Sequence, residues 1–148
     1  MLIACLLIYL YIPSFKKGER SMKDAMKILI AEADIGIATK LKDYLKSFGH
    51  KVLSVVTSGE DLMENVKLLN PSLIIADINL NGQLDGIEAI ARLESNYEIP
   101  YIFITAYDDY SRLITSYYLK PVGIIAKPVN QTDLRESIEK VRFDLQPV

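Results

Sequence analysis

The sequence contains a single cysteine, Cys5, so no disulfide can form within the chain. This excludes the small secreted scaffolds that disulfides hold together. Glycine and proline are also sparse, at seven and six residues, and no low-complexity run occurs, which excludes a collagenous chain or a linker. Basic residues are not in excess: the formal net charge is −2, so we expect no nucleic-acid partner. The 148 residues, 50% of them hydrophobic and 24% charged, indicate a single globular domain.

Charge and apolar residues are distributed unevenly along the chain. Residues 1–27 carry five basic and two acidic side chains, a net charge of +3, whereas residues 28–148 carry a net charge of −5. Residues 1–12 are all apolar and are followed by Pro13 and a basic stretch. This run is too short for a membrane span, which needs about 20 apolar residues. It also lacks the preceding basic residues of a signal peptide.

Three interpretations of residues 1–25 stay open. In the first, the start codon is assigned too early, because Met22 or Met26 would begin a more ordinary chain. In the second, the segment is a weak anchor or an interfacial helix. In the third, it is an extra element packed on the domain or on a partner. The basic residues that follow the apolar run would leave the rest of an anchored chain in the cytoplasm. We therefore divide the chain into an extension over residues 1–25 and a cytoplasmic domain over residues 26–146, with membrane contact only if residues 1–12 anchor it.

From residue 27 onward, short apolar runs alternate with amphipathic segments. The runs have the length of strands and cover residues 28–31, 52–56, 73–76, 101–104 and 122–126. Apolar residues at helical spacing predict helices over residues 37–48, 58–69, 87–93, about 109–119, and from Asn130 to about 145. Strands that alternate with helices and are apolar throughout predict an α/β fold with a doubly wound, five-stranded parallel sheet. Ligands of such sheets bind at the carboxyl ends of the strands.

Polar side chains stand where these strands end. They are Glu32 and Asp34 after the first strand, Asp77 after the third, Thr105 after the fourth and Lys127 after the fifth. Carboxylate oxygens are the ligands that Mg²⁺ prefers, and a carboxylate can also act as a nucleophile that carries a phosphoryl group. A lysine and a hydroxyl would then donate hydrogen bonds to the phosphoryl oxygens. The pattern thus points to a magnesium or phosphoryl site at this edge.

Four segments carry a resemblance to a known family. They are KILIAEAD at residues 27–34, LIIADINLNGQLDGIEA at 73–89, IFITA at 102–106 and GIIAKP at 123–128. In this order and spacing they resemble the receiver domain of response regulators in two-component signalling, of the CheY-like superfamily, over about residues 26–146. The resemblance implies a flavodoxin-like (βα)5 fold.

The resemblance also implies roles for individual residues. Asp77 would accept a phosphoryl group from a histidine kinase or a phosphotransfer protein, with Thr105 as the switch hydroxyl and Lys127 as the lysine of the site. Pro128 would follow a cis peptide bond. Such a domain is not an enzyme beyond phosphotransfer and its own dephosphorylation. Only three residues follow the expected final helix, so we expect a stand-alone receiver that signals by contact with a downstream protein, or as a homodimer.

The implied Mg²⁺ site departs from the family pattern. The resemblance makes Asp77, the backbone carbonyl of Asn79 and the outer acidic residue Glu32 its ligands. The family usually has a second acidic residue after the first strand, but that position here is Ala33. Asp34 follows one residue later, where its side chain should turn another way. The metal site is therefore weakened, completed by Asp34, or lost.

A second departure concerns the signal. The family usually has an aromatic switch residue three positions before the lysine, and this chain has Ile124, which has no ring to move. An alternative function is therefore a phosphorylation-independent pseudo-receiver, a binding module of the same fold. Tyrosines on the fourth helix would suit a partner surface.

One enzyme class, a nucleotide-binding domain and one metal ligand are disfavoured. An aspartate-nucleophile phosphohydrolase needs an acid–base residue two positions after Asp77, and Asn79 cannot do that work. A nucleotide-binding fold needs a glycine-rich turn after the first strand, where only Gly36 is found. One histidine makes no metal site, and we expect His50 at the surface.

Overall fold

A computed structural model describes residues 25–116 and 118–145, so the expectations for residues 1–24 lie outside the described residues. The strands are β1 (Lys27–Ala31), β2 (Lys51–Val56), β3 (Leu73–Asp77), β4 (Tyr101–Thr105) and β5 (Gly123–Ala126). The helices are α2 (Ile35–Ser47), α3 (Gly59–Leu69), α4 (Gly86–Glu94), the short 3-10 helix η2 (Tyr107–Asp109), α5 (Tyr110–Thr115) and α6 (Gln131–Asp144). Among the described residues, no helix is long and apolar enough to cross a membrane.

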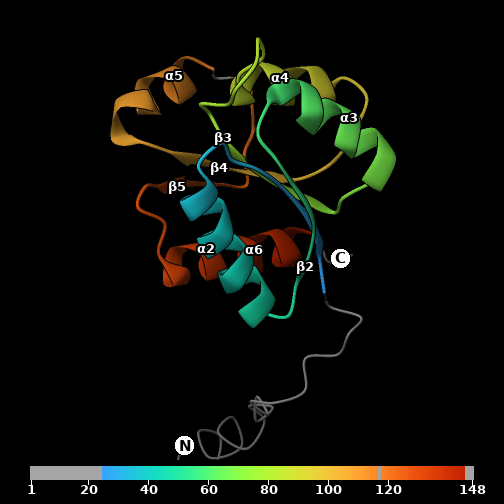
Figure 1. Ribbon diagram of the computed structural model, residues 1–148, viewed down its shortest axis with the longest axis vertical. Helices are drawn as coiled ribbons and strands as arrows, with labels where there is room; N and C mark the ends of the chain where they lie inside the picture. Colours follow the sequence, from blue (N-terminus) through green and yellow to red (C-terminus); the bar gives the residue numbers. More distant parts are fainter. Residues whose placement is uncertain (1–24, 117, 146–148) are drawn as a thin grey trace, which may run out of the picture.

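The strands form one parallel sheet in the order β2-β1-β3-β4-β5. The chain runs outward from β1 to β2 and then returns to place β3 on the other side of β1. The direction of progression therefore reverses between β1 and β3, which is where ligands of doubly wound sheets bind. Helices α2 and α6 cover one face, and α3, α4 and α5 cover the other (Figure 1). The predicted fold is confirmed.

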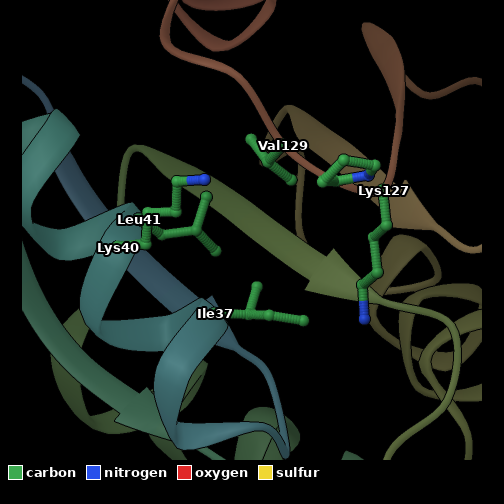
Figure 2. Close-up of a pocket in the computed structure, with 6 residues that line it drawn as sticks. Ile37, Lys40, Leu41, Lys127 and Val129 are labelled. Atoms are coloured by element: carbon green, nitrogen blue, oxygen red, sulfur yellow. The ribbon is translucent and has the colours of Figure 1, made fainter.

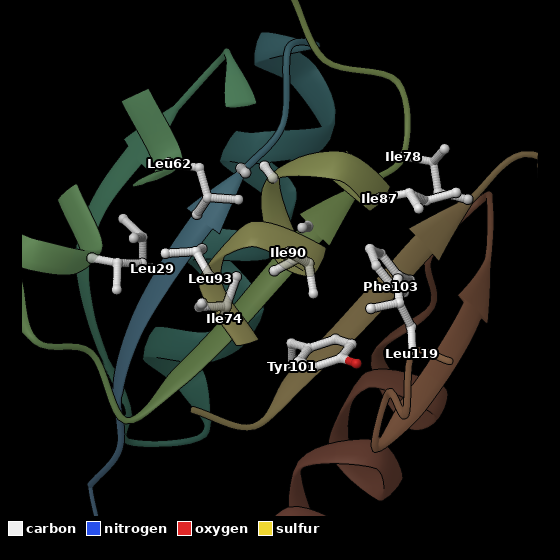
Figure 3. Close-up of a cluster of buried hydrophobic side chains, with 14 of the residues drawn as sticks. Leu29, Leu62, Ile74, Ile78, Ile87, Ile90, Leu93, Tyr101, Phe103 and Leu119 are labelled. Atoms are coloured by element: carbon white, nitrogen blue, oxygen red, sulfur yellow. The ribbon is translucent and has the colours of Figure 1, made fainter. Parts of the chain in front are cut away.

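The core forms on both faces of the sheet because the central strands are apolar on both sides. Every side chain of β3 and β4 is buried. On one face, Ile74 and Phe103 pack with Leu62 of α3 and Ile90 of α4 (Figure 3). On the other, strand residues pack against the apolar stripes of α2 and α6. This burial holds the carboxyl ends of the strands in fixed positions relative to one another.

The helix ends follow local signals in the sequence. The Ser58 side chain accepts a hydrogen bond from the Asp61 N–H at 3.1 Å, and the Asn130 side chain accepts one from the Asp133 N–H at 2.8 Å, so each caps the helix that follows it. Gly49, with φ of 85°, follows α2 in the left-handed conformation that ends many helices.

The fourth predicted helix is shorter than the expected 109–119. It splits into η2 and the six-residue α5, which ends at Thr115. The hydroxyls of Thr115 and Ser116 both donate to the Arg112 carbonyl, each at 2.9 Å. Such side-chain bonds compete with the helical backbone, and Ser116 has a non-helical ψ of 48°. With Leu113 as its buried side chain, the segment has too little apolar surface to favour a longer helix.

The prediction that His50 lies at the surface is wrong. The side chain is 9% exposed, and its Nδ1 accepts a hydrogen bond from the Met26 N–H at 3.2 Å. His50 directly precedes β2, which pairs with β1, so its ring meets the residue that leads into β1. This contact between residues distant in the sequence leaves no local signal.

Candidate functional site

Asp77, the last residue of β3, is 4% exposed at the carboxyl edge of the sheet. Its Oδ2 accepts a hydrogen bond from Lys127 Nζ at 2.7 Å, and its Oδ1 accepts one from the backbone N–H of Asn79 at 3.3 Å. Lys127 directly follows β5, and its bond to Pro128 is cis, as the resemblance implied. The structure thus brings together Asp77 and Lys127, 50 residues apart in the sequence.

Glu32 is a second buried carboxylate at this edge, 2% exposed. Its Oε1 accepts a hydrogen bond from the Asp34 N–H at 2.9 Å, and its Oε2 lies 3.1 Å from Lys127 Nζ. Despite that ion pair, Oε2 makes no well-directed hydrogen bond to any of the described residues. Burial, with the charge of Asp77, raises the pKa of Glu32, against the opposing effects of the Asp34 N–H and of Lys127.

The lysine is held in its charged form by the two carboxylates. Burial alone would lower the pKa of Lys127, but the hydrogen bond and charge of Asp77, followed by the ion pair with Glu32, raise it. Two buried carboxylates therefore face one ammonium, and when both are ionised the group carries one uncompensated negative charge.

Thr105 ends β4, directly beside this group, and is 1% exposed. Asp77 pairs with Ile104 in the sheet, so Thr105 lies one residue further along the neighbouring strand. Its hydroxyl donates a hydrogen bond to the Ala106 carbonyl at 2.9 Å. The hydroxyl is therefore at the predicted edge but is directed to the backbone.

The residues present fit a magnesium ion in part. The uncompensated charge and the Oε2 atom of Glu32 without a directed hydrogen bond are features that a cation would stabilise. Glu32 and Asp77 would hold it, since Mg²⁺ is usually bound by one or two carboxylates, with water and phosphate oxygens completing the shell. Ala33 adds no side-chain oxygen, and across the described residues no three His, Cys, Asp or Glu side chains form a metal-binding group.

The structure does not direct Asp34 to this group. Its Oδ1 accepts a hydrogen bond from the Ile37 N–H at 2.9 Å and so caps the start of α2. A role for Asp34 as a metal ligand therefore stays a prediction, as does the role of the Asn79 carbonyl.

A network that the sequence does not predict covers the loop after Asp77. Arg112 of α5 donates to the Asn79 side-chain oxygen at 3.1 Å and forms an ion pair with Asp85, the N-cap of α4. The Asn79 side-chain amide donates in turn to Asp109. Arg112 and Asp109 belong to the segment with the weakest sequence pattern, so no spacing signal could have identified them.

The same loop is held from its other side by α3. The Oε1 atom of Glu60 accepts hydrogen bonds from the backbone N–H groups of Gln83 and Leu84, at 2.8 and 3.2 Å. Its own backbone N–H and that of Gln83 lower the pKa of the Glu60 carboxyl. Both ends of the loop after Asp77 are therefore fixed by side chains from neighbouring helices.

An apolar hollow lies beside Lys127, on the face that α2 covers. Its volume is about 340 Å³, and its lining comes from α2 and from the residues that follow β5 (Figure 2). The lining residues are Ile37, Lys40, Leu41, Lys127, Pro128 and Val129. The lysine that pairs with Asp77 thus also lines this hollow.

Exposed apolar side chains occur on the opposite side of the site. Ile124 on β5 is 42% exposed, and Tyr107, Tyr110 and Ile114 between β4 and β5 are also exposed. The use of these tyrosines by a partner stays a prediction.

Comparisons with known proteins point to one family. The family described as the response regulator receiver domain matches residues 28–139. The phyllosphere-induced regulator PhyR of Methylorubrum extorquens is 34% identical over 120 residues, which cover 80% of this chain and 44% of PhyR. The chain spans about half the length of the curated relatives it matches.

Two solved structures show the same fold. The signal receiver domain of a modulated diguanylate cyclase from Desulfovibrio desulfuricans has a TM-score of 0.74 and 35% identity, and the match covers 82% of this chain and 99% of that one. The anti-anti-sigma factor PhyR from Bartonella quintana has a TM-score of 0.70 and 27% identity over 83% of this chain and 50% of that one. Together with the match over residues 28–139, these similarities show that the chain belongs to the response-regulator receiver family.

Proposed function

We propose that this chain is a phosphoacceptor receiver: Asp77 accepts a phosphoryl group from a phosphohistidine donor, and the changed state is passed on by protein contact. The observation that carries the proposal is the partly buried Asp77–Lys127 pair, 2.7 Å long, with Glu32 and Thr105 beside it. A nucleophilic carboxylate, a cation and a hydroxyl at one edge are the groups that phosphoryl transfer to an aspartate requires.

Each residue has a distinct part in the proposed transfer. An oxygen of Asp77 attacks phosphorus as the bond between phosphorus and the donor imidazole nitrogen breaks, and the electron pair of that bond leaves with the imidazole. The Lys127 ammonium, which donates to Asp77 Oδ2, would donate to the new phosphoryl oxygens. The Thr105 hydroxyl would exchange the Ala106 carbonyl for a phosphoryl oxygen. A bound magnesium ion supplies neutralisation of the phosphoryl charge.

Protein partners are part of the same proposal. The hollow beside Lys127 offers an apolar contact surface to a histidine kinase or phosphotransfer protein at the place where the phosphoryl group arrives. One structural relative is described as an anti-anti-sigma factor, which fits an output through a downstream protein. The cytoplasmic location and the division of the chain near residue 25 also belong to this proposal.

The test is incubation of the full chain with acetyl phosphate over a series of Mg²⁺ concentrations, followed by intact mass measurement. We expect one added phosphoryl group that is lost in Asp77→Asn and retained in Asp43→Asn, a control at an exposed position of α2. Because Ala33 leaves the site one carboxylate short, Ala33→Asp should lower the Mg²⁺ concentration needed. No phosphoryl group on Asp77 at any Mg²⁺ concentration would overturn the proposal.

A second candidate is the phosphorylation-independent binding module. Ala33, which lacks a carboxylate, and Ile124, which lacks a ring and is 42% exposed, favour it. The two functions differ in the effect of Asp77→Asn on a captured downstream partner. The binding module predicts unchanged affinity without phosphodonor, whereas the phosphoacceptor predicts that phosphodonor changes the affinity of the unaltered chain alone.

A further inference from the structure

Arg112 connects two parts of the molecule that the sheet itself does not hold together, the loop after Asp77 and helix α5. Its guanidinium donates to Asn79 Oδ1 at 3.1 Å and pairs with Asp85 at the start of α4. The Nδ2 atom of Asn79 donates to Asp109, directly before α5. The oxygen and the nitrogen of the Asn79 side-chain amide are thus hydrogen-bonded to Arg112 in α5 and to Asp109 directly before it.

Asn79 also touches the phosphoacceptor. Its backbone N–H donates to Asp77 Oδ1 at 3.3 Å. A continuous series of polar contacts therefore runs from the Asp77 carboxylate through Asn79 to Arg112, and it does not involve position 124. Contacts of this kind can carry a change of state between two sites when the element they hold has two arrangements.

Helix α5 has few other attachments that could fix its position. Of its six residues, all described, Leu113 is the buried one, and Tyr110 and Ile114 are 47% and 64% exposed. On the neighbouring strand β5, Ile124 is 42% exposed and has no ring that could report on Thr105. The polar contacts of Arg112 are therefore a large share of what positions α5.

We propose that Arg112 is a positioning residue that transmits the state of Asp77 to α5. This rests on the proposed function, because the state in question is phosphorylation of Asp77. When an Asp77 oxygen is bonded to phosphorus, the carboxylate charge that the Asn79 N–H faces moves to the phosphoryl oxygens. The Asn79 N–H then shifts toward the phosphoryl oxygens. Because the Asn79 side chain is hydrogen-bonded to Arg112, this shift also moves Arg112 and α5. The exposed side chains of α5 then present a different surface to a partner.

The coupling itself can be tested without any phosphorylation, by hydrogen exchange on the full chain. Arg112→Ala and Asn79→Ala should each speed amide exchange in both residues 79–85 and α5, by roughly two- to fivefold, as expected for loss of a partly exposed ion pair. The double variant should fall clearly short of the sum of the two single variants, because the two side chains share the contact between them. Arg142→Ala, which removes a surface ion pair with Glu139 on α6, is the matched control and should leave both segments unchanged.

Additive effects, or effects confined to the substituted segment, would overturn the inference. If Arg112→Ala fails to fold, Asn79→Ala alone decides, since the Asn79 side chain is exposed and a coupled network must still loosen α5.

A second measurement separates this inference from the proposed function. Hydrogen exchange in α5 is compared before and after treatment with acetyl phosphate and Mg²⁺, and the change is divided by the phosphorylated fraction from intact mass. We expect a change in the unaltered chain and in Arg142→Ala, and at least a halving of it in Arg112→Ala. An equal change in Arg112→Ala overturns the inference and leaves the proposed function standing. An absence of phosphorylation in the unaltered chain overturns the proposed function, and with it the transmission of phosphorylation through Arg112.

Discussion

Gly86 passes so close to Asp77 that a methyl group on its Cα would lie 2.0 Å from the Asp77 carbonyl oxygen. The Gly86 N–H also donates to the Ile78 carbonyl at 2.8 Å, so the start of α4 packs directly against the backbone at Asp77. Asp85 caps the helix through its bond with the Glu88 N–H. The Asp-Gly pair therefore fixes where Asp77 stands as well as where α4 begins.

Gly86→Ala should displace the Asp77 backbone and destabilise the domain by about 1–3 kcal/mol, the usual cost of overpacking a filled site. Urea unfolding measures the loss, and intact mass measures the accompanying drop in phosphoryl incorporation. Gly36→Ala is the control, because its methyl group would meet only the Asp34 side chain, at 3.2 Å, at an exposed position of α2. Equal losses of stability in the two variants would contradict this prediction, because the close approach of Gly86 to Asp77 would then not account for the loss.

Lys127→Ala should leave the chain folded and cost about 2 kcal/mol of stability, because Asp77 loses its charged hydrogen-bond donor and Glu32 loses its ion-pair partner. Phosphoryl incorporation should fall more steeply than stability. The raised pKa of Lys127 means that its stabilising contribution is present at neutral pH and is lost only as the pH rises beyond the ordinary lysine value of 10.5. Lys40→Ala, at the rim of the same hollow, should change neither property appreciably. A Lys127→Ala protein that incorporates phosphoryl groups at the normal rate would contradict the assigned role.

Glu32→Gln should make the domain more stable at neutral pH. Burial raises the pKa of Glu32 in the folded state above its ordinary value of 4.5, so ionisation of this group costs the folded state stability as the pH rises through the folded pKa. Below pH 4.5 the carboxyl is protonated in both states, and the advantage of the glutamine should disappear. The free energies of unfolding of the unaltered chain and of Glu32→Gln, measured along this pH range, test whether the substitution stabilises the domain. A glutamine variant that is less stable at neutral pH would refute it, and Glu136→Gln at an exposed position of α6 serves as the control.

Tyr101→Phe should cost about 1–2 kcal/mol although the ring remains in place. The hydroxyl donates to Glu94 Oε1 at 2.5 Å and accepts from the Lys120 N–H at 2.7 Å, so its removal leaves two groups without their partner. Burial and the hydrogen bond to Glu94 raise the pKa of Tyr101, which keeps this hydroxyl protonated. Urea unfolding and faster amide exchange at Lys120 would report the loss. Tyr107→Phe, at a side chain that is 90% exposed, should be neutral, and an equal cost for both would contradict the assignment.

The sheet could be predicted closely because its signal is local. Strands buried on both faces are apolar runs, and β3 and β4 begin where the runs at residues 73 and 101 begin. Ser58 and Asn130 mark helix starts through side chains that bond the backbone three residues on. The length of α5 and the burial of His50 were not predictable, because each depends on contacts or backbone competition that no periodicity records.

The site was predictable in composition but not in orientation. The carboxyl ends of parallel strands meet at one edge, so Asp77, Thr105 and Lys127 could be placed together from the strand pattern. The orientation of a side chain depends on the group with which it forms a hydrogen bond or ion pair in the folded structure. Asp34 is used as a helix cap, and the sequence could not show it. Arg112 lies 27 residues from Asp85, its partner, in a segment without a clear period.

The shortness of α5 has a consequence for how such a domain can diverge. β4 and β5 pair directly in the sheet, and the connection between them buries little in its helical part beyond Leu113. Substitutions at the exposed positions of residues 107–115 therefore carry little folding cost, whereas substitutions in β3 or β4 disturb a filled core. On the proposed function, the surface offered to a partner can change on this connection while the edge that carries Asp77 stays constant, so duplicated copies of the domain could acquire separate partners.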